Sequence, residues 1–166
     1  MKHLSLFSLI VIAFGLFACD KDDDPLPNQL VGSWESRYFV DSVDYWVVNT
    51  LEFKNDSVYQ FRTTVRDSEA GPDLGYRMYY DDRYEWDGMN FKYLPDLAYW
   101  IDYKEEAFYV PQQELRAGII DYFHQPIARI TFIDNKERLL FQEQCPENPA
   151  FGCEEPRDPI EYVRVD

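Results

Sequence analysis

The strongest constraint on the fold is a two-residue alternation of apolar and polar side chains that begins near residue 43. Over 43–53, one register carries Val, Tyr, Val, Leu and Phe, while the other register is mostly polar. The segments 59–65 and 76–86 repeat this pattern. Successive side chains of a β-strand point to opposite faces, whereas a helix repeats every 3.6 residues. The alternation therefore predicts half-buried strands, and no segment sustains a helical repeat over three turns.

Turn-forming residues divide these segments into hairpins. Residues 54–56 (Lys-Asn-Asp) are a turn signal, and two glycines and a proline place a loop in 66–75. Asp82 interrupts the apolar register of its segment, which predicts either a β-bulge or an inward-pointing charge. A short helical turn is expected within 95–103. Further strands are expected at 32–40, 107–110, 115–123, 127–133, 139–142 and 160–165.

Short antiparallel strands of this number avoid exposed edges best by closing on themselves. An aromatic fraction of 17% also suits the pleated surfaces of a sheet. We therefore predict an all-β domain over 30–166, an antiparallel meander β-barrel of about eight strands. Such a barrel either fills its interior with side chains or leaves room for one small ligand, and that choice decides its function.

The first 18 residues have the character of an export signal. A charged start precedes an apolar run, 4–18, that is shorter than the roughly 20 residues of a membrane-spanning helix. Residues 16–19, Leu-Phe-Ala-Cys, resemble the lipobox of bacterial lipoproteins, although a residue smaller than Phe17 is usual at its position. The resemblance implies cleavage after residue 18, acylation of Cys19, and attachment to a membrane through the acyl chains.

Residues 19–29 are interpreted as an acidic tether, because they are charged, contain two prolines and have little to bury. An acidic stretch after a lipidated cysteine resembles the export tag of surface lipoproteins in some Gram-negative lineages. In enterobacterial-type sorting, an Asp directly after the cysteine implies inner-membrane retention instead. We favour a cell-envelope lipoprotein of the outer membrane, surface-exposed or facing the periplasm. A solvated spacer is the plainer interpretation of the same residues.

Charge and cysteine content narrow the choice of partners. The formal net charge of −15 disfavours nucleic acid and anionic lipid head groups. With Cys19 acylated, Cys145 and Cys153 remain as an even pair in an oxidising compartment, which predicts a disulfide across a turn-rich loop. A metal or redox pair is the competing interpretation, but the spacing, with no histidine nearby, matches no zinc pattern.

Sequence motifs for catalysis are missing. Beyond the export signal the chain has one histidine, His124, and it has no nucleophile elbow, Walker loop or dinucleotide-binding glycine motif. The acidic residues of 67–73 and 81–82 lack the ligand order of a calcium loop. Paired carboxylates could support glycoside hydrolysis, but 31 acidic residues allow no pair to be singled out. We therefore expect no enzyme activity, no metal and no cofactor.

Three segments resemble, in order, the bacterial lipocalin-like lipoproteins, a branch of the calycin barrels. Residues 30–34 (Leu-Val-Gly-Ser-Trp) resemble the Gly-x-Trp start of the first lipocalin strand. Residues 51–59 resemble a second hairpin of pattern Leu-x-Phe-x-x-Asp-x-x-Tyr, and 162–165 resemble the closing strand. The stretch 66–126 matches no motif of the family. The resemblance implies a lipocalin-like barrel.

The resemblance also implies roles for individual residues. Trp34 would plug the closed end of the barrel, and Arg164 would pack across its ring. Aromatic side chains on the inward registers could form a cup for a small apolar or amphipathic ligand, or they could simply fill the core. These candidates are Tyr45, Tyr59, Phe61, Tyr80, Tyr84 and Trp86. A second class of function is a filled barrel that contacts an envelope protein or a glycan through the outward-pointing Trp46 and Tyr79.

Overall fold

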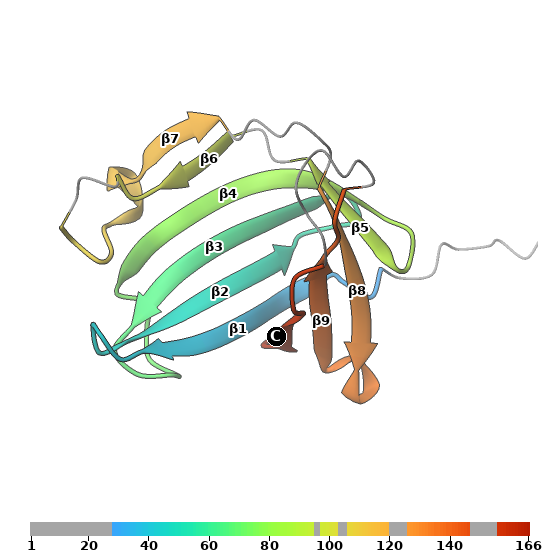
Figure 1. Ribbon diagram of the computed structural model, residues 1–166, viewed down its shortest axis with the longest axis horizontal. Helices are drawn as coiled ribbons and strands as arrows, with labels where there is room; N and C mark the ends of the chain where they lie inside the picture. The colour runs from blue at the N-terminus through green and yellow to red at the C-terminus, as the bar shows by residue number, and fades with distance from the viewer. Residues whose placement is uncertain (1–27, 95–96, 103–105, 120–125, 147–155) are drawn as a thin grey trace, which may run out of the picture.

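The computed structural model describes residues 28–94, 97–102, 106–119, 126–146 and 156–166 (Figure 1). The predicted export signal, Cys19, most of the tether, His124 and Cys153 lie outside these residues, so the predictions made for them stay predictions. Within the described ranges, no helix is both long enough and apolar enough to cross a membrane.

The chain forms a single antiparallel sheet of ten strands. Two short 3-10 turns, η1 (Gln112–Glu114) and η2 (Asp134–Lys136), accompany the strands. The strands are β1 (Gly32–Val40), β2 (Tyr45–Phe53), β3 (Val58–Arg66), β4 (Gly75–Trp86), β5 (Asn90–Leu94), β6 (Leu97–Trp100), β7 (Arg116–Ile119), β8 (Ile127–Ile133), β9 (Arg138–Glu143) and β10 (Ile160–Arg164).

Eight of the ten strands are hydrogen-bonded in a closed ring, in the order β3-β2-β1-β10-β9-β8-β5-β4, and the pairing of β3 with β4 completes it. The predicted all-β antiparallel meander is therefore confirmed, with β6 and β7 inserted between β5 and β8. The ring is not a regular barrel, because one edge of β4 pairs with two different strands. The last residues of β4 pair with β5, whereas its Met78 and Tyr79 pair with β6. The β6–β7 pair thus extends the sheet beyond one end of the ring (Figure 1).

Trp34 is fully buried in the core of the ring. Its indole Nε1 donates a hydrogen bond of 2.8 Å to the carbonyl oxygen of Leu30. The guanidinium carbon of Arg164 lies 4.2 Å from the centre of the Trp34 ring, a cation–π distance. Arg164 also donates to the carbonyl oxygens of Val31 and Gln29, at 3.1 and 2.9 Å. The structure therefore brings together the tryptophan and the arginine to which the lipocalin resemblance assigned structural roles.

The sequence-based assignment of elements was wrong in three places. Residues 97–100 form strand β6 where a helical turn was expected, because pairing with β4 and β7 satisfies their backbone groups. The segment 107–110 contributes only an isolated bridge, from Val110 to Tyr76. Strand β5 was not expected, since its five residues offer only two alternating aromatic positions, Phe91 and Tyr93.

The question left open at Asp82 is answered by the strand register. The irregularity between β3 and β4 lies at Thr63 and Thr64, far from Asp82. Asp82 keeps its place directly opposite Tyr59, on the same face of β4 as Tyr80 and Tyr84. Asp82 is therefore the inward charge of the two alternatives, and it is half-buried.

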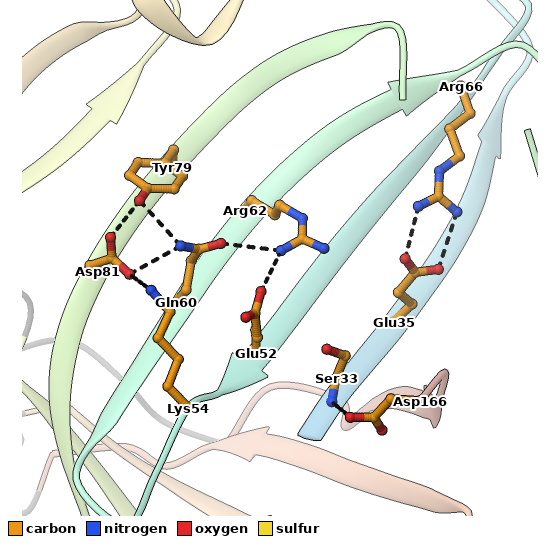
Figure 2. Close-up of polar contacts among 10 residues, drawn as sticks. All are labelled: Ser33, Glu35, Glu52, Lys54, Gln60, Arg62, Arg66, Tyr79, Asp81 and Asp166. Atoms are coloured by element: carbon orange, nitrogen blue, oxygen red, sulfur yellow. Dashed lines mark hydrogen bonds and ion pairs between the residues drawn. The ribbon is translucent and has the colours of Figure 1, made fainter. Parts of the chain in front are cut away.

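The outer face of β1–β4 carries a set of paired polar side chains (Figure 2). At one end, Asp81 accepts hydrogen bonds from Tyr79, from Gln60 at 3.1 Å and from Lys54 at 2.7 Å. The set continues through the ion pairs Arg62–Glu52 and Arg66–Glu35. The polar groups of this set bind one another, whereas the Thr50 hydroxyl on the same face is buried without a hydrogen-bond partner among the described residues. The inner face of the same strands, in contrast, is mainly apolar and rich in aromatic rings.

Candidate functional site

A cavity of about 200 Å³ lies within the ring, and strands β2–β5, β9 and β10 all contribute to its wall. We call it the aromatic cup. Its rings are Tyr59, Phe61, Tyr80, Phe91, Tyr93, Phe141 and Tyr162. Its other lining residues are Leu51, Ile160, Asn49, Glu143, Arg157 and Asp158.

Strand register brings these rings together. Tyr59 and Phe61 occupy alternate positions of β3, and Phe61 stands opposite Leu51 on one side and Tyr80 on the other. The rings of Phe61 and Tyr80 stack at 5.1 Å, while Tyr59 stands nearly perpendicular to Tyr80 at 6.0 Å. Phe91 is likewise perpendicular to Tyr59, at 5.4 Å. Stacked and edge-on contacts of this kind hold aromatic walls in place.

The hydroxyl of Tyr59 is the most unusual polar group of the cup. Tyr59 is only 1% exposed, and its Oη has no hydrogen-bond partner of good geometry among the residues that the structure describes. Burial raises the pKa of Tyr59, and the nearby Tyr80 and Asp82 raise it further, so the phenol is neutral at pH 7. An unsatisfied buried hydroxyl costs roughly 1–3 kcal/mol, which a molecule in the cup could recover by hydrogen bonding to it.

Polar residues gather at the rim of the cup. Glu143 forms an ion pair of 2.9 Å with Arg157 and lies 3.2 Å from the Tyr93 hydroxyl, which donates to it. The Arg157 side chain is 82% exposed, so water screens its charge strongly. Asp158 is also exposed. The cup therefore joins an apolar aromatic interior to a wet, charged rim.

Three of the six side chains predicted to bind a ligand line the cup: Tyr59, Phe61 and Tyr80. Sequence reasoning missed the others, including the four rings that come from β5, β9 and β10. Phe91 and Tyr93 were missed because β5 was missed. Phe141 and Tyr162 lie on expected strands, and the same alternation rule would have found them.

The other three candidates, Tyr45, Tyr84 and Trp86, do not line the cup. Tyr45 lies at the far end of β2, where its ring stacks on Phe108 at 6.1 Å. Tyr84 is 3% exposed and donates to the carbonyl oxygen of Asn55 at 2.6 Å. Trp86 packs edge-on against Phe132 at 6.0 Å. Tyr84 belongs to the core and Trp86 packs against it, as the competing interpretation predicts, whereas Tyr45 packs outside the core cluster. Alternation gives the face of a strand but not the position of a side chain along it.

The two outward-pointing candidates differ in their surroundings. Trp46 packs against Phe39 at 5.6 Å, and Phe39 is 42% exposed. Tyr79 lies in an open hollow of about 510 Å³ on the outer face, beside Tyr99. Burial, together with the hydrogen bond to Asp81, raises the pKa of Tyr79 to about 12. The hydroxyl of Tyr79 is thus already engaged within the outer polar set.

In the described part of the chain, no three His, Cys, Asp or Glu side chains gather closely enough to hold a metal ion. Cys145 follows β9, but Cys153 lies outside the described residues, so the predicted disulfide stays a prediction. The chain matches no protein-family model, no curated protein and no solved structure.

Proposed function

We propose that this protein is a membrane-anchored lipoprotein of the bacterial cell envelope, with a lipocalin-like barrel that binds a small apolar or amphipathic molecule in the aromatic cup. The observation that carries the proposal is the buried Tyr59 hydroxyl, unpartnered among the described residues, in the wall of an aromatic cavity. Ligand sites are mostly apolar cavities with a few polar groups that orient the ligand, and the cup has that composition.

The dimensions of the cup limit the ligand. Pockets for drug-sized molecules have volumes of roughly 300–1,000 Å³. At about 200 Å³, the cup suits a smaller molecule with one compact apolar body. A polar end of that molecule could bind the Tyr59 hydroxyl or reach the rim at Glu143. Long acyl chains and extended ring systems do not fit this volume.

The anchor is the second part of the proposal, and it comes from the sequence. The lipobox-like residues 16–19 and the acidic stretch behind them support acylation of Cys19 and display at the outer membrane. A binding domain on such a tether would sample molecules that enter the envelope.

A second candidate function is contact with another envelope protein or a glycan. The adjoining rings of Phe39 and Trp46 support it, because they pack at 5.6 Å and Phe39 is 42% exposed. Exposed apolar groups that adjoin one another can mark a partner surface. This function would use the hairpin β1–β2 and would not require the cup.

Blocking the cup tests the proposed binding function. Ile160 lines the cup and is 44% exposed, whereas Val163 on the same strand is 45% exposed and has the opposite strand parity. We expect Ile160→Trp to abolish binding of benzyl alcohol, since the indole fills the opening, and Val163→Trp to preserve it. Saturation-transfer NMR of benzyl alcohol with each purified variant measures this. Equal binding by the two variants, or none by the wild type, would contradict the proposal.

A further inference from the structure

The charged groups around the aromatic cup are weighted toward acid. Among its lining residues, Glu143 and Asp158 are negative and only Arg157 is positive. Asp82 adds a third carboxylate, because it stands opposite Tyr59 on the inward face of β4 and is half-buried. A charge beside a low-dielectric cavity acts over a longer distance than the same charge in water. The electrostatic environment of the cup therefore favours positive charge.

The walls of the cup favour the same sign. The face of an aromatic ring carries the negative part of its quadrupole, and cations bind against it. Because Tyr59 is nearly perpendicular to both Tyr80 and Phe91, the wall of the cup contains rings in more than one orientation. Aromatic cages of this kind hold alkylammonium groups, which are large and weakly hydrated.

The single basic residue of the cup does little to oppose this preference. The Arg157 side chain is 82% exposed and pairs with Glu143, so solvent and a carboxylate both weaken its field. Glu143 is additionally held toward the cup by the hydroxyl of Tyr93 at 3.2 Å. A carboxylate fixed beside a ring of the wall is well placed to meet the charge of a bound cation.

We infer that the aromatic cup selects a small organic cation, an alkylamine or a quaternary ammonium compound, whose charged group contacts the rings and faces Glu143. The inference rests on the proposed binding function and adds the charge of the ligand to it. The buried Tyr59 hydroxyl, unpartnered among the described residues, would bind the polar end that such molecules commonly carry. An anionic ligand held by Arg157 is the opposing possibility, and the same experiment distinguishes the two.

Three probes of nearly equal shape separate the effect of charge from that of size. Choline is the cation, 3,3-dimethylbutan-1-ol is its neutral isostere, and 3,3-dimethylbutanoate is the anion. We expect isothermal titration calorimetry at low salt to show choline binding roughly tenfold more tightly than the alcohol. The anion 3,3-dimethylbutanoate should bind most weakly. If 3,3-dimethylbutan-1-ol binds as tightly as choline, or if 3,3-dimethylbutanoate binds best, the inference is overturned while the binding function stands. Failure of all three probes would overturn the inference, and the benzyl alcohol measurement decides separately whether the binding function stands.

Charge-neutralising variants identify the residue that makes the cup prefer a cation. Glu143→Gln should weaken choline binding by roughly threefold or more and leave the alcohol unchanged. Glu161→Gln is the matched control, because Glu161 has the opposite parity on β10 and pairs with Arg138 outside the cup. Arg157→Gln should strengthen choline binding, since it releases Glu143. If Arg157→Gln instead weakens choline binding, or if Glu143→Gln and Glu161→Gln have the same effect, Glu143 is not the source of the preference for a cation. Far-ultraviolet circular dichroism of each variant confirms that the sheet is intact.

Discussion

At the residue scale, the Glu35–Arg66 pair is the most buried charge interaction of the outer face. Two hydrogen bonds of 2.8 and 3.1 Å join the side chains, whose exposures are only 8% and 11%. Glu35 lies on β1 and Arg66 on β3, so the pair spans the intervening strand β2. It covers Val48 of that strand, which is fully buried. Arg37 and Asp73 complete the network, at 2.7 Å to Glu35 and 2.6 Å to Arg66. Long charged side chains thus exclude water from small apolar ones beneath them.

Removing one member of this pair should be costly. We expect Arg66→Met to lower the free energy of unfolding by about 3 kcal/mol, because it leaves Glu35 buried with only Arg37 as its partner. Arg62→Met is the control on the same strand, since Arg62 pairs with the more exposed Glu52 at 2.9 Å. That change should cost about 1 kcal/mol or less. Urea denaturation of both variants measures the difference, and equal losses would contradict the assigned burial.

The pH dependence of the Arg66→Met effect follows from Glu35. Burial by itself raises the pKa of Glu35, but hydrogen bonds from Arg66 and Arg37 outweigh it and hold the pKa below the ordinary 4.5. The stability contributed by a group with a lowered pKa is complete above its ordinary pKa and is lost as the pH falls through the lowered one. The loss of stability in Arg66→Met should therefore be largest at neutral pH and shrink in acid.

At the scale of elements, β4 decides the shape of the site. Its twelve residues pair with β3 along one edge and are shared by β5 and β6 along the other. Closure through the short β5 brings Phe91 and Tyr93 against the rings of β3 and β4. Without that closure, the aromatic cup would lose the part of its wall that Phe91 and Tyr93 form.

The contribution of β5 can be measured at Phe91, which is 1% exposed and contacts several rings, among them Tyr59 and Phe141. We expect Phe91→Ala to lower the free energy of unfolding by about 4 kcal/mol, since it opens a cavity at the centre of the core. Phe39→Ala removes the same ring from a 42% exposed position and should cost about 1 kcal/mol or less. Urea denaturation should distinguish them clearly. Similar costs would mean that β5 does not close the ring.

At the scale of the whole molecule, Trp34 lies buried in the core of the ring, and the rim of the aromatic cup carries the acidic residues Glu143 and Asp158. An aromatic cavity with a charged rim suits the proposed binding of a small molecule from solution. The formal net charge of −15 disfavours contact with anionic head groups, so the proposed attachment to a membrane relies on the acyl chains at Cys19.

The anchor is tested by changing a single sulfur atom. We expect Cys19→Ser expressed in a Gram-negative host to move the protein from the membrane fraction to the soluble fraction, because serine cannot carry the thioether-linked lipid. The intact mass of the wild type should show cleavage before Cys19 and added acyl groups. Wild-type protein found at full length and without acyl groups in the cytosol would refute the anchoring proposal.

Much of the fold was predictable because a strand repeats its side chains every two residues. Alternation located β2, β3 and β4 to within a few residues, and the less regular segments expected for β1, β8, β9 and β10 also lie close to the observed strands. It failed for β5 and β6, which are five and four residues long and carry too few alternating positions to stand out. Of the six candidate binding residues, Tyr59, Phe61 and Tyr80 line the aromatic cup, whereas Tyr45, Tyr84 and Trp86 lie elsewhere along their strands, and whether any of them binds a ligand stays a prediction.

The amino-acid sequence by itself determined which face of each long strand is apolar, because the direction of a side chain is a local property of the extended backbone. The sequence also supplies the prediction of an export signal, because that prediction depends on local residues and not on the fold. Tertiary structure alone decided which strands meet, that β4 serves two neighbours, and which rings surround a cavity instead of filling the core. Those outcomes depend on hydrogen bonds between segments far apart in the chain, whose register no local pattern specifies.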